Sequence, residues 1–149
     1  MSRPEIDLNA IRREAMGLLA RAPVARLAEL LPDLPDHDVL RAPEIGTVMV
    51  RGRAGGTGAA FNLGEMTVTR ASIRLPSGAV GHGYVQGRDK AHARRAAAAD
   101  ALAQSDPEGC EAHIFAPLRA EESARRAAIA AEAAATKVEF FTLVRGEDA

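Results

Sequence analysis

The stretch that most constrains the fold of this chain runs from Thr47 to Lys90, where apolar residues repeat with a period of two. Three such runs are separated by a glycine-dense loop and by the sequence Leu-Pro-Ser-Gly at 75–78, which has proline and glycine where a tight turn prefers them. Alternation of this kind is typical of β-strands. We therefore predict a three-stranded antiparallel meander.

The second of these runs changes face near Arg70. Met66 and Val68 share one parity, whereas the apolar residues that follow share the other, namely Ala71, Ile73 and Leu75. A strand whose side chains alternate can show such a switch only if it contains a bulge or is covered on both sides. Both alternatives stay open at this point.

Helical spacing predicts two helices before the meander and two alanine-rich helices after it. The first covers residues 11–22 with Asp7 or Asn9 as its N-cap, the second starts at Pro23, and residues 32–43 form a connector. After the meander, Asp89 caps a helix over 90–104, and a second helix covers 119–135. Residues 111–118 and 138–144 are predicted as further strands, the last pairing with a sheet edge or another subunit.

The fold class predicted from these elements is α+β, with a meander of three to five strands packed by helices in one domain over 1–149. The 149 residues are 47% apolar, which suits one domain with a core. Cys110 is the only cysteine, so an intrachain disulfide is excluded, and no signal peptide or membrane-spanning run is seen. We expect a cytoplasmic protein without a membrane association.

Charge is segregated along the chain. Residues 41–95 carry nine Lys and Arg against three acidic residues, a net charge of +6, while both flanks are acidic. Basic residues and glycines together suit a phosphate-bearing ligand, because glycine lets backbone N–H groups approach an anion closely. A solvated hairpin loop and an ordinary mixed surface are the alternatives. The candidates for phosphate binding or an interface are Arg51, Arg53, Gly55, Gly56, Gly58, Asn62, Glu65, Arg70, His82, Arg88, Lys90 and His92.

No catalytic set can be read from the residues. His82 alternates with Val80 and Tyr84, which favours a structural histidine on the packed face. No spacing supplies the three or four ligands of a metal site, and no nucleophile–base pair is visible. The glycine loop lacks the Gly-Lys-Ser/Thr ending of a P-loop and is followed by a strand, unlike a dinucleotide fingerprint. We therefore predict no catalytic residue, no metal and no bound cofactor in this chain.

One alternative comes from topology. A helix, a three-stranded meander and a basic helix, here GRDKAHARRAAAADAL at 87–102, is also the order of a double-stranded RNA-binding domain. Against it, the chain is longer than such a module and its net charge is −1. A small phosphate- or RNA-binding module is therefore the second hypothesis, with nucleic acid the less favoured partner.

The blocks RGRAGGTGAAFNLGEMTVTR at 51–70, GHGYVQGRDKAHA at 81–93 and KVEFFTLVRGE at 137–147 resemble the PhnG family, which belongs to the bacterial carbon–phosphorus lyase core complex. The resemblance implies a partner of subunits H, I and J and of an ATP-binding-cassette-like subunit, with self-association within the complex. It implies a role in displacing adenine from ATP, with magnesium, by a phosphonate in organic phosphonate catabolism. No residue carries over as catalytic.

The resemblance and the charge pattern lead to one hypothesis about the candidate residues. The basic ones face either the nucleotide triphosphate or an acidic patch on a neighbouring subunit. The apolar tail supplies interface candidates, which are Phe140, Phe141, Leu143 and Arg145.

Overall fold

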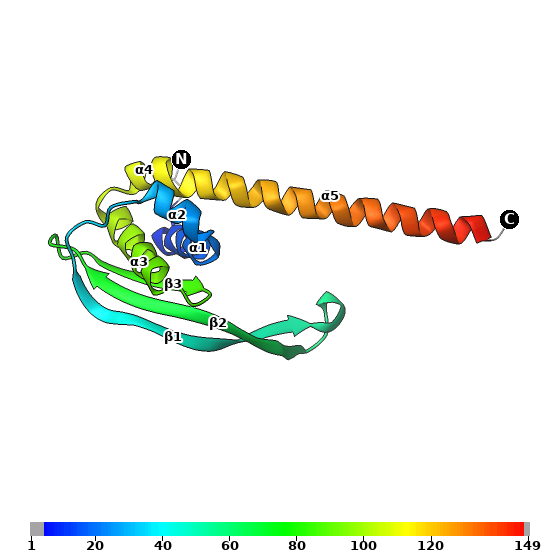
Figure 1. The fold of residues 1–149 in the computed structure, drawn as a ribbon, viewed down its shortest axis with the longest axis horizontal. Coiled ribbons are helices and arrows are strands. Elements are labelled where there is room, and N and C mark those ends of the chain that lie inside the picture. The colour runs from blue at the N-terminus through cyan, green and yellow to red at the C-terminus, as the bar shows by residue number, and fades with distance from the viewer. Residues whose placement is uncertain (1–4, 148–149) are drawn as a thin grey trace. The chain divides into compact units, whose positions relative to one another are not determined.

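The computed structural model describes residues 5–147, and for residues 138–147 it describes the backbone. Contacts divide the chain into two compact units, Met1–Phe115 and Ala116–Ala149. The first unit contains α1 (Leu8–Arg21), α2 (Val24–Leu30), β1 (Asp38–Arg53), a 3-10 turn (Ala54–Gly56), β2 (Ala60–Arg74), β3 (Val80–Gln86), α3 (Lys90–Ser105), α4 (Pro107–Cys110) and a π-helical turn (Glu111–Phe115). The second is one helix, α5 (Ala116–Glu147) (Figure 1). The predicted α+β class is confirmed.

The predicted meander is also confirmed. Within the described residues the sheet has three strands in the order β1-β2-β3, and both pairs are antiparallel. The predicted turn joins β2 to β3, with the Gly78 N–H donating to the Leu75 carbonyl at 2.9 Å. Gly78 has φ +92°, a left-handed conformation that favours glycine.

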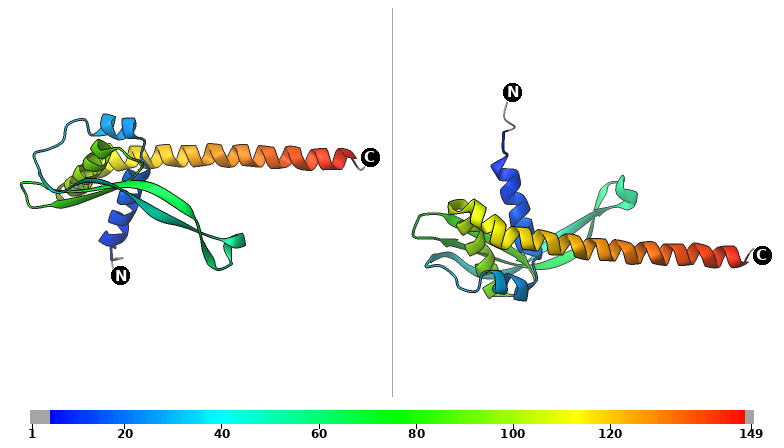
Figure 2. Two further views of the ribbon diagram at one scale, coloured as in Figure 1. Left: turned by 60° about the horizontal axis from the view of Figure 1, so that its bottom comes forward. Right: turned by 90° about the horizontal axis from the view of Figure 1, so that it is seen from above.

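β1 and β2 continue beyond the end of β3 as a two-stranded arm, residues 48–66 (Figures 1 and 2). The β2–β3 pairing stops at Val68, whereas β1 and β2 stay paired as far as Arg53 and Ala60. Most side chains of the arm are exposed. A two-stranded ribbon that buries so little apolar surface is marginally stable by itself in water.

Helix α3 is seated directly on the backbone of β3. Gly81 and Gly83 face it, and a Cβ on Gly83 would overlap the Ala93 carbonyl oxygen and lie 2.9 Å from the Ala97 nitrogen. The expectation that His82 lies on the packed face is therefore wrong. Two inward positions of β3, 81 and 83, are glycines because the alanine-rich helix leaves no room for side chains there, and His82 projects from the opposite face.

The N-terminal helices and the connector complete the core of the first unit. Asp7 caps α1 by accepting from the Asn9 and Ala10 N–H groups, and Asp89 caps α3 by accepting from the His92 N–H at 2.9 Å, so both predicted caps are confirmed. One core cluster joins the end of β2 to α3, with partly buried leucines of the connector packed against it. Its members are Ile73, Leu75, Ala97, Ala98 and Ala101.

The switch of parity in β2 has one of the two expected causes, which is cover on both faces of the strand, and a bulge of β2 near Arg70 is not found. The register between β2 and β3 is continuous from Val68 to Arg74, so the irregularity is not in that pair. Val68 and Thr69, which project from opposite faces, are both buried. Two bulges lie in β1, where the register against β2 shifts on either side of Arg41, and a third shift, between Val50 and Arg51, lies in the arm.

One predicted boundary and two predicted strands are corrected. The connector ends at 37 rather than 43, because β1 starts at Asp38 and tolerates Pro43 at a bulge of an edge strand. Residues 111–118 form the π-helical turn and the start of α5, and residues 138–144 are helical as the continuation of α5. A short alternation of apolar residues cannot overrule an alanine-rich helix that precedes it, because adding a residue to a formed helix costs little.

No helix in the described part of the chain is both long and apolar enough to cross a bilayer.

Candidate functional site

The sheet presents two rows of polar side chains on the face that α3 leaves uncovered. The register places one residue of each strand in each row. The first row is Arg41, Ser72 and His82, and the second is Glu44, Arg70 and Tyr84. Side chains paired across antiparallel strands lie on the same face and within reach of one another. The fold thus gathers residues from three separate segments into one cluster.

The bulge in β1 is what brings Arg41 into this cluster. Residues 41 and 44 are three positions apart, so in a regular strand they would project from opposite faces. The register shift between them inserts one extra residue, and Arg41 pairs with Ser72 while Glu44 pairs with Arg70, two positions apart on β2. Sequence reasoning missed Arg41 because it assigned residues 32–43 to a connector. Pro43 was the available signal, because proline within a strand is confined to edges and bulges.

Two guanidinium groups of the cluster share one carboxylate oxygen. Glu44 Oε2 lies 3.4 Å from both Arg41 Nη1 and Arg70 Nε, and the two arginine side chains are about half exposed, at 50% and 54%. Among the side chains of residues 5–137 these are the contacts that the two guanidiniums make, so most of their N–H donors have no acceptor in that part of the chain. Two positive charges against one negative charge leave the cluster with a net positive charge.

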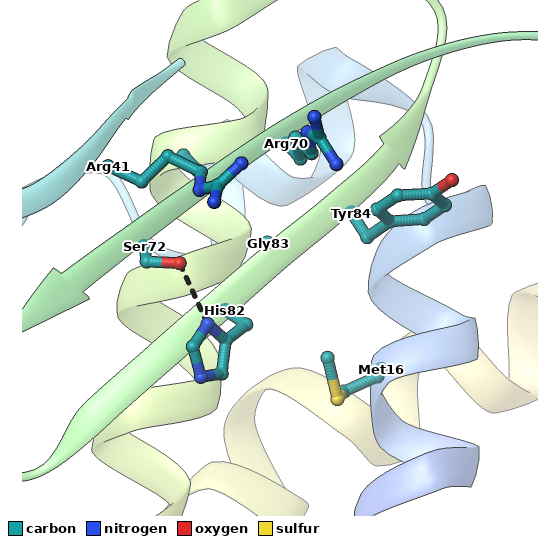
Figure 3. Close-up of a pocket in the computed structure, with 8 residues that line it drawn as sticks. Met16, Arg41, Arg70, Ser72, His82, Gly83 and Tyr84 are labelled. Atoms are coloured by element: carbon teal, nitrogen blue, oxygen red, sulfur yellow. Dashed lines mark hydrogen bonds between the residues drawn. The ribbon is translucent and has the colours of Figure 1, made fainter. Parts of the chain in front are cut away.

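An open hollow of about 470 Å³ lies over the two rows. Arg41, Arg70, Ser72 and His82 line it together with Met16 of α1 and Tyr84 (Figure 3). Ser72 Oγ and His82 Nδ1 are 2.7 Å apart and hydrogen-bonded across the strands. Polar donors on one side and an aromatic and a thioether side chain on the other make the hollow suitable for an anion that carries a small organic group.

The strand that bears His82 is fixed from behind by Asp100 of α3. Asp100, 3% exposed, accepts a hydrogen bond from the His82 backbone N–H at 2.9 Å and a bidentate pair from Arg12 of α1, at 3.0 Å to Oδ1 and 2.8 Å to Oδ2. The hydrogen bond to Asp100 is the main reason why the pKa of Arg12 is raised. One carboxylate therefore ties α1, α3 and β3 together next to the hollow.

Comparisons with known proteins show which family the chain belongs to. Residues 10–146 match the family model described as phosphonate metabolism protein PhnG. A protein of Rhizobium meliloti (strain 1021), named alpha-D-ribose 1-methylphosphonate 5-triphosphate synthase subunit PhnG, is 50% identical over 147 residues, covering 93% of this chain and 92% of the relative. The chain belongs to the PhnG family. The resemblance found in the sequence is thereby confirmed.

In this PhnG family member most of the other predicted site residues lie on the arm, outside the hollow. Arg51 and Arg53 end β1, Gly55 and Gly56 turn the chain with φ +62° and +78°, Gly58 closes the tip, and Asn62 and Glu65 lie on β2. The glycine-dense segment is thus a hairpin tip, shorter than predicted because β2 starts at Ala60. A phosphate-binding or interface role for these residues stays a prediction.

The remaining candidates fall in two other places. Arg88 and Lys90 are exposed at the start of α3, whereas His92 is 1% exposed and lies in the interior. Burial lowers the pKa of His92, and the nearby Ala22 backbone forms no hydrogen bond of acceptable geometry with either ring nitrogen. The tail candidates Phe140, Phe141, Leu143 and Arg145 lie on α5, where the structure describes the backbone alone.

Two further observations concern cysteine and possible metal ligands in the PhnG chain. Cys110 is buried, and burial raises the pKa of its thiol, so the nucleophilic thiolate is disfavoured. Among the side chains that the structure describes, residues 5–137, no three of His, Cys, Asp or Glu gather as a metal site would require.

Two of the four basic residues in the segment that suggested the RNA-binding alternative form hydrogen bonds within the fold. Arg94 Nε donates to His37 Nε2 at 3.1 Å, and Arg95 Nε donates to the Leu31 carbonyl at 3.0 Å, so both arginines hold the connector against α3. A recognition helix of that kind needs its basic side chains turned towards phosphates. The contacts of Arg94 and Arg95 within the fold therefore disfavour the RNA-binding alternative.

Proposed function

We propose that this PhnG family member is a subunit of an alpha-D-ribose 1-methylphosphonate 5-triphosphate synthase. In this role it assists the displacement of adenine from ATP by a phosphonate during organic phosphonate catabolism. The observation that carries the proposal is the 50% identity to a relative of that name, which extends over nine-tenths of both chains. The chain acts as a component of a transferase and is not catalytic alone.

The partners are subunits H, I and J of the carbon–phosphorus lyase complex and its ATP-binding-cassette-like subunit, with self-association inside the complex. The arm supports the proposal that the chain works in an assembly, because the arm exposes large apolar side chains that no other element covers in the described residues. Phe61 and Leu63 are 45% and 62% exposed. Apolar surface of this kind is typical of an interface.

ATP, with magnesium, is the substrate of the complex, and no cofactor is held by this subunit alone. The cytoplasm is the proposed compartment, because ATP and the partner subunits are there. The absence of a disulfide is compatible with that compartment, since Cys110 has no second cysteine to pair with.

Co-purification tests the proposal. The tagged full-length chain is expressed together with subunits H, I and J, and the eluted material is analysed by size-exclusion chromatography and by mass. We expect one stoichiometric complex that contains all four subunits. A soluble tagged chain that leaves the other three behind would contradict the proposed function.

A further inference from the structure

The hollow over β1, β2 and β3 has the chemistry of an oxyanion site. We infer that it binds the tetrahedral oxyanion of an organic phosphonate or phosphate, held by Arg41, Arg70, Ser72 and His82. The identity of the ligand rests on the proposed function, whereas the existence of an anion site rests on the geometry of the cluster.

The donors converge from three strands. Arg41 and Arg70 come from β1 and β2, and the Ser72 hydroxyl and the His82 ring lie in the same row as Arg41, next to the row of Arg70 (Figure 3). Guanidinium groups present planar arrays of N–H donors that match two oxygens of a phosphate or phosphonate. Since these strands also pack against α3 from behind, the backbone that carries the donors is fixed.

Glu44 contacts both of the arginines that the oxyanion would contact. Its Oε2 accepts from both arginines at 3.4 Å, longer than the roughly 2.7–2.9 Å of a strong charge-assisted hydrogen bond. A ligand with two negative charges and three oxygens can offer both guanidiniums shorter contacts than one shared carboxylate oxygen does. Glu44 thus keeps the two arginines side by side without a ligand and competes with a ligand for them.

The other side of the hollow selects the substituent of the anion. Met16 of α1 and Tyr84 of β3 line it, and Tyr84 is 43% exposed. A thioether and the face of an aromatic ring offer apolar contact to a carbon group, which a bare inorganic ion lacks. The hollow, at about 470 Å³, also has room for more than a phosphate group alone. The ligand class is therefore an organic phosphorus oxyanion.

Titration of the purified full-length chain tests the inference. Methylphosphonate, ribose 5-phosphate, inorganic phosphate and sulfate are added separately, and the backbone amide resonances are followed by NMR. We expect methylphosphonate or ribose 5-phosphate to shift the resonances around residues 70–72 and 82–84 in a saturable way and more strongly than sulfate does. The comparison of the affinities for methylphosphonate and ribose 5-phosphate shows whether the site prefers a phosphonate or a phosphate ester.

Three variants separate an anion site from a structural ion pair. Arg70→Gln should weaken binding about tenfold, because it removes a charge-assisted contact. Glu44→Gln should tighten binding about fivefold, because the competing charge near the surface is gone. Arg74→Gln is the matched control, since Arg74 pairs with Asp38 at 3.5 Å one row further along β2 and does not line the hollow. The affinity of the Arg74→Gln variant for the oxyanion should stay within about twofold of that of the parent chain.

The direction in which each variant changes the affinity for the oxyanion tests the inference. If Glu44→Gln weakens binding as Arg70→Gln does, or if no phosphorus oxyanion produces saturable shifts in this region, the inference is overturned. Equal binding of sulfate would reject the phosphorus ligand class. A chain that binds the oxyanion but does not co-purify with subunits H, I and J contradicts the proposed function alone, and a chain that co-purifies without binding contradicts this inference alone.

Discussion

A methyl group added to Gly83 tests how α3 and β3 pack. The new Cβ would overlap the Ala93 carbonyl oxygen and lie 2.9 Å from the Ala97 nitrogen, whereas uncharged non-bonded heavy atoms prefer about 3.5–4.0 Å. Both neighbours belong to the backbone of a helix, so they cannot move aside as a side chain could. The helix must therefore shift away from the sheet.

The cost of that shift can be estimated from the packing. α3 buries eight residues, and moving it loosens contacts along its length. Overpacking of a core costs about 1–3 kcal/mol, and a collision with backbone belongs at the upper end. Replacing glycine by alanine also returns about 0.4–1 kcal/mol by restricting the unfolded chain. We therefore expect Gly83→Ala to lower the free energy of unfolding by about 2 kcal/mol.

Urea denaturation followed by circular dichroism measures this change, and Gly46→Ala is the matched control. Gly46 lies on β1 of the same sheet, and a Cβ there would meet nothing within 4 Å, so that variant should be as stable as the parent or slightly more stable. Equal stability of Gly83→Ala and Gly46→Ala would refute the direct contact between α3 and the β3 backbone.

Asp100→Ala should lower the free energy of unfolding by about 3 kcal/mol, because the Arg12 guanidinium and the His82 N–H lose their acceptor. A loss below about 1 kcal/mol in the same urea assay would mean that the Asp100 carboxylate does not link α1, α3 and β3. Burial lowers the pKa of His92, so its contribution to stability is complete above its ordinary pKa of 6.5 and is lost as the pH falls below that value towards the lowered pKa of the folded state. Urea midpoints measured on either side of pH 6.5 should show this loss in the parent chain and a smaller one in His92→Leu. Deleting residues 138–149 should leave a soluble monomer that no longer assembles, and normal co-purification of the shortened chain with its partner subunits would count against the tail as an interface.

The elements that the sequence predicts well are those set by local chemistry. The meander follows from the alternation of apolar residues, the β2–β3 turn from Pro76 and Gly78, and the caps of α1 and α3 from Asp7 and Asp89. Each depends on residues within one or two turns of the chain. Such signals need no knowledge of what packs against the element.

The elements that the sequence predicts poorly depend on competition between neighbouring segments. Residues 138–144 alternate like a strand but continue α5, and residues 38–43 read as a connector but form the bulged start of β1. In both cases the local pattern allows two structures. The neighbouring helix or the partner strand selects one of them.

By itself, the sequence determined the fold class, the order of the strands, the family and the presence of a basic centre, because periodicity, turn chemistry and motif spacing are written along the chain. Only the tertiary structure decided which of these residues meet. Alternation fixes that His82 and Gly83 project from opposite faces, but the face that α3 covers depends on where a helix fits without a Cβ in its way. The bulge in β1 then decided that Arg41 joins Arg70 in one hollow, since pairing between distant strands is not a property of either segment alone.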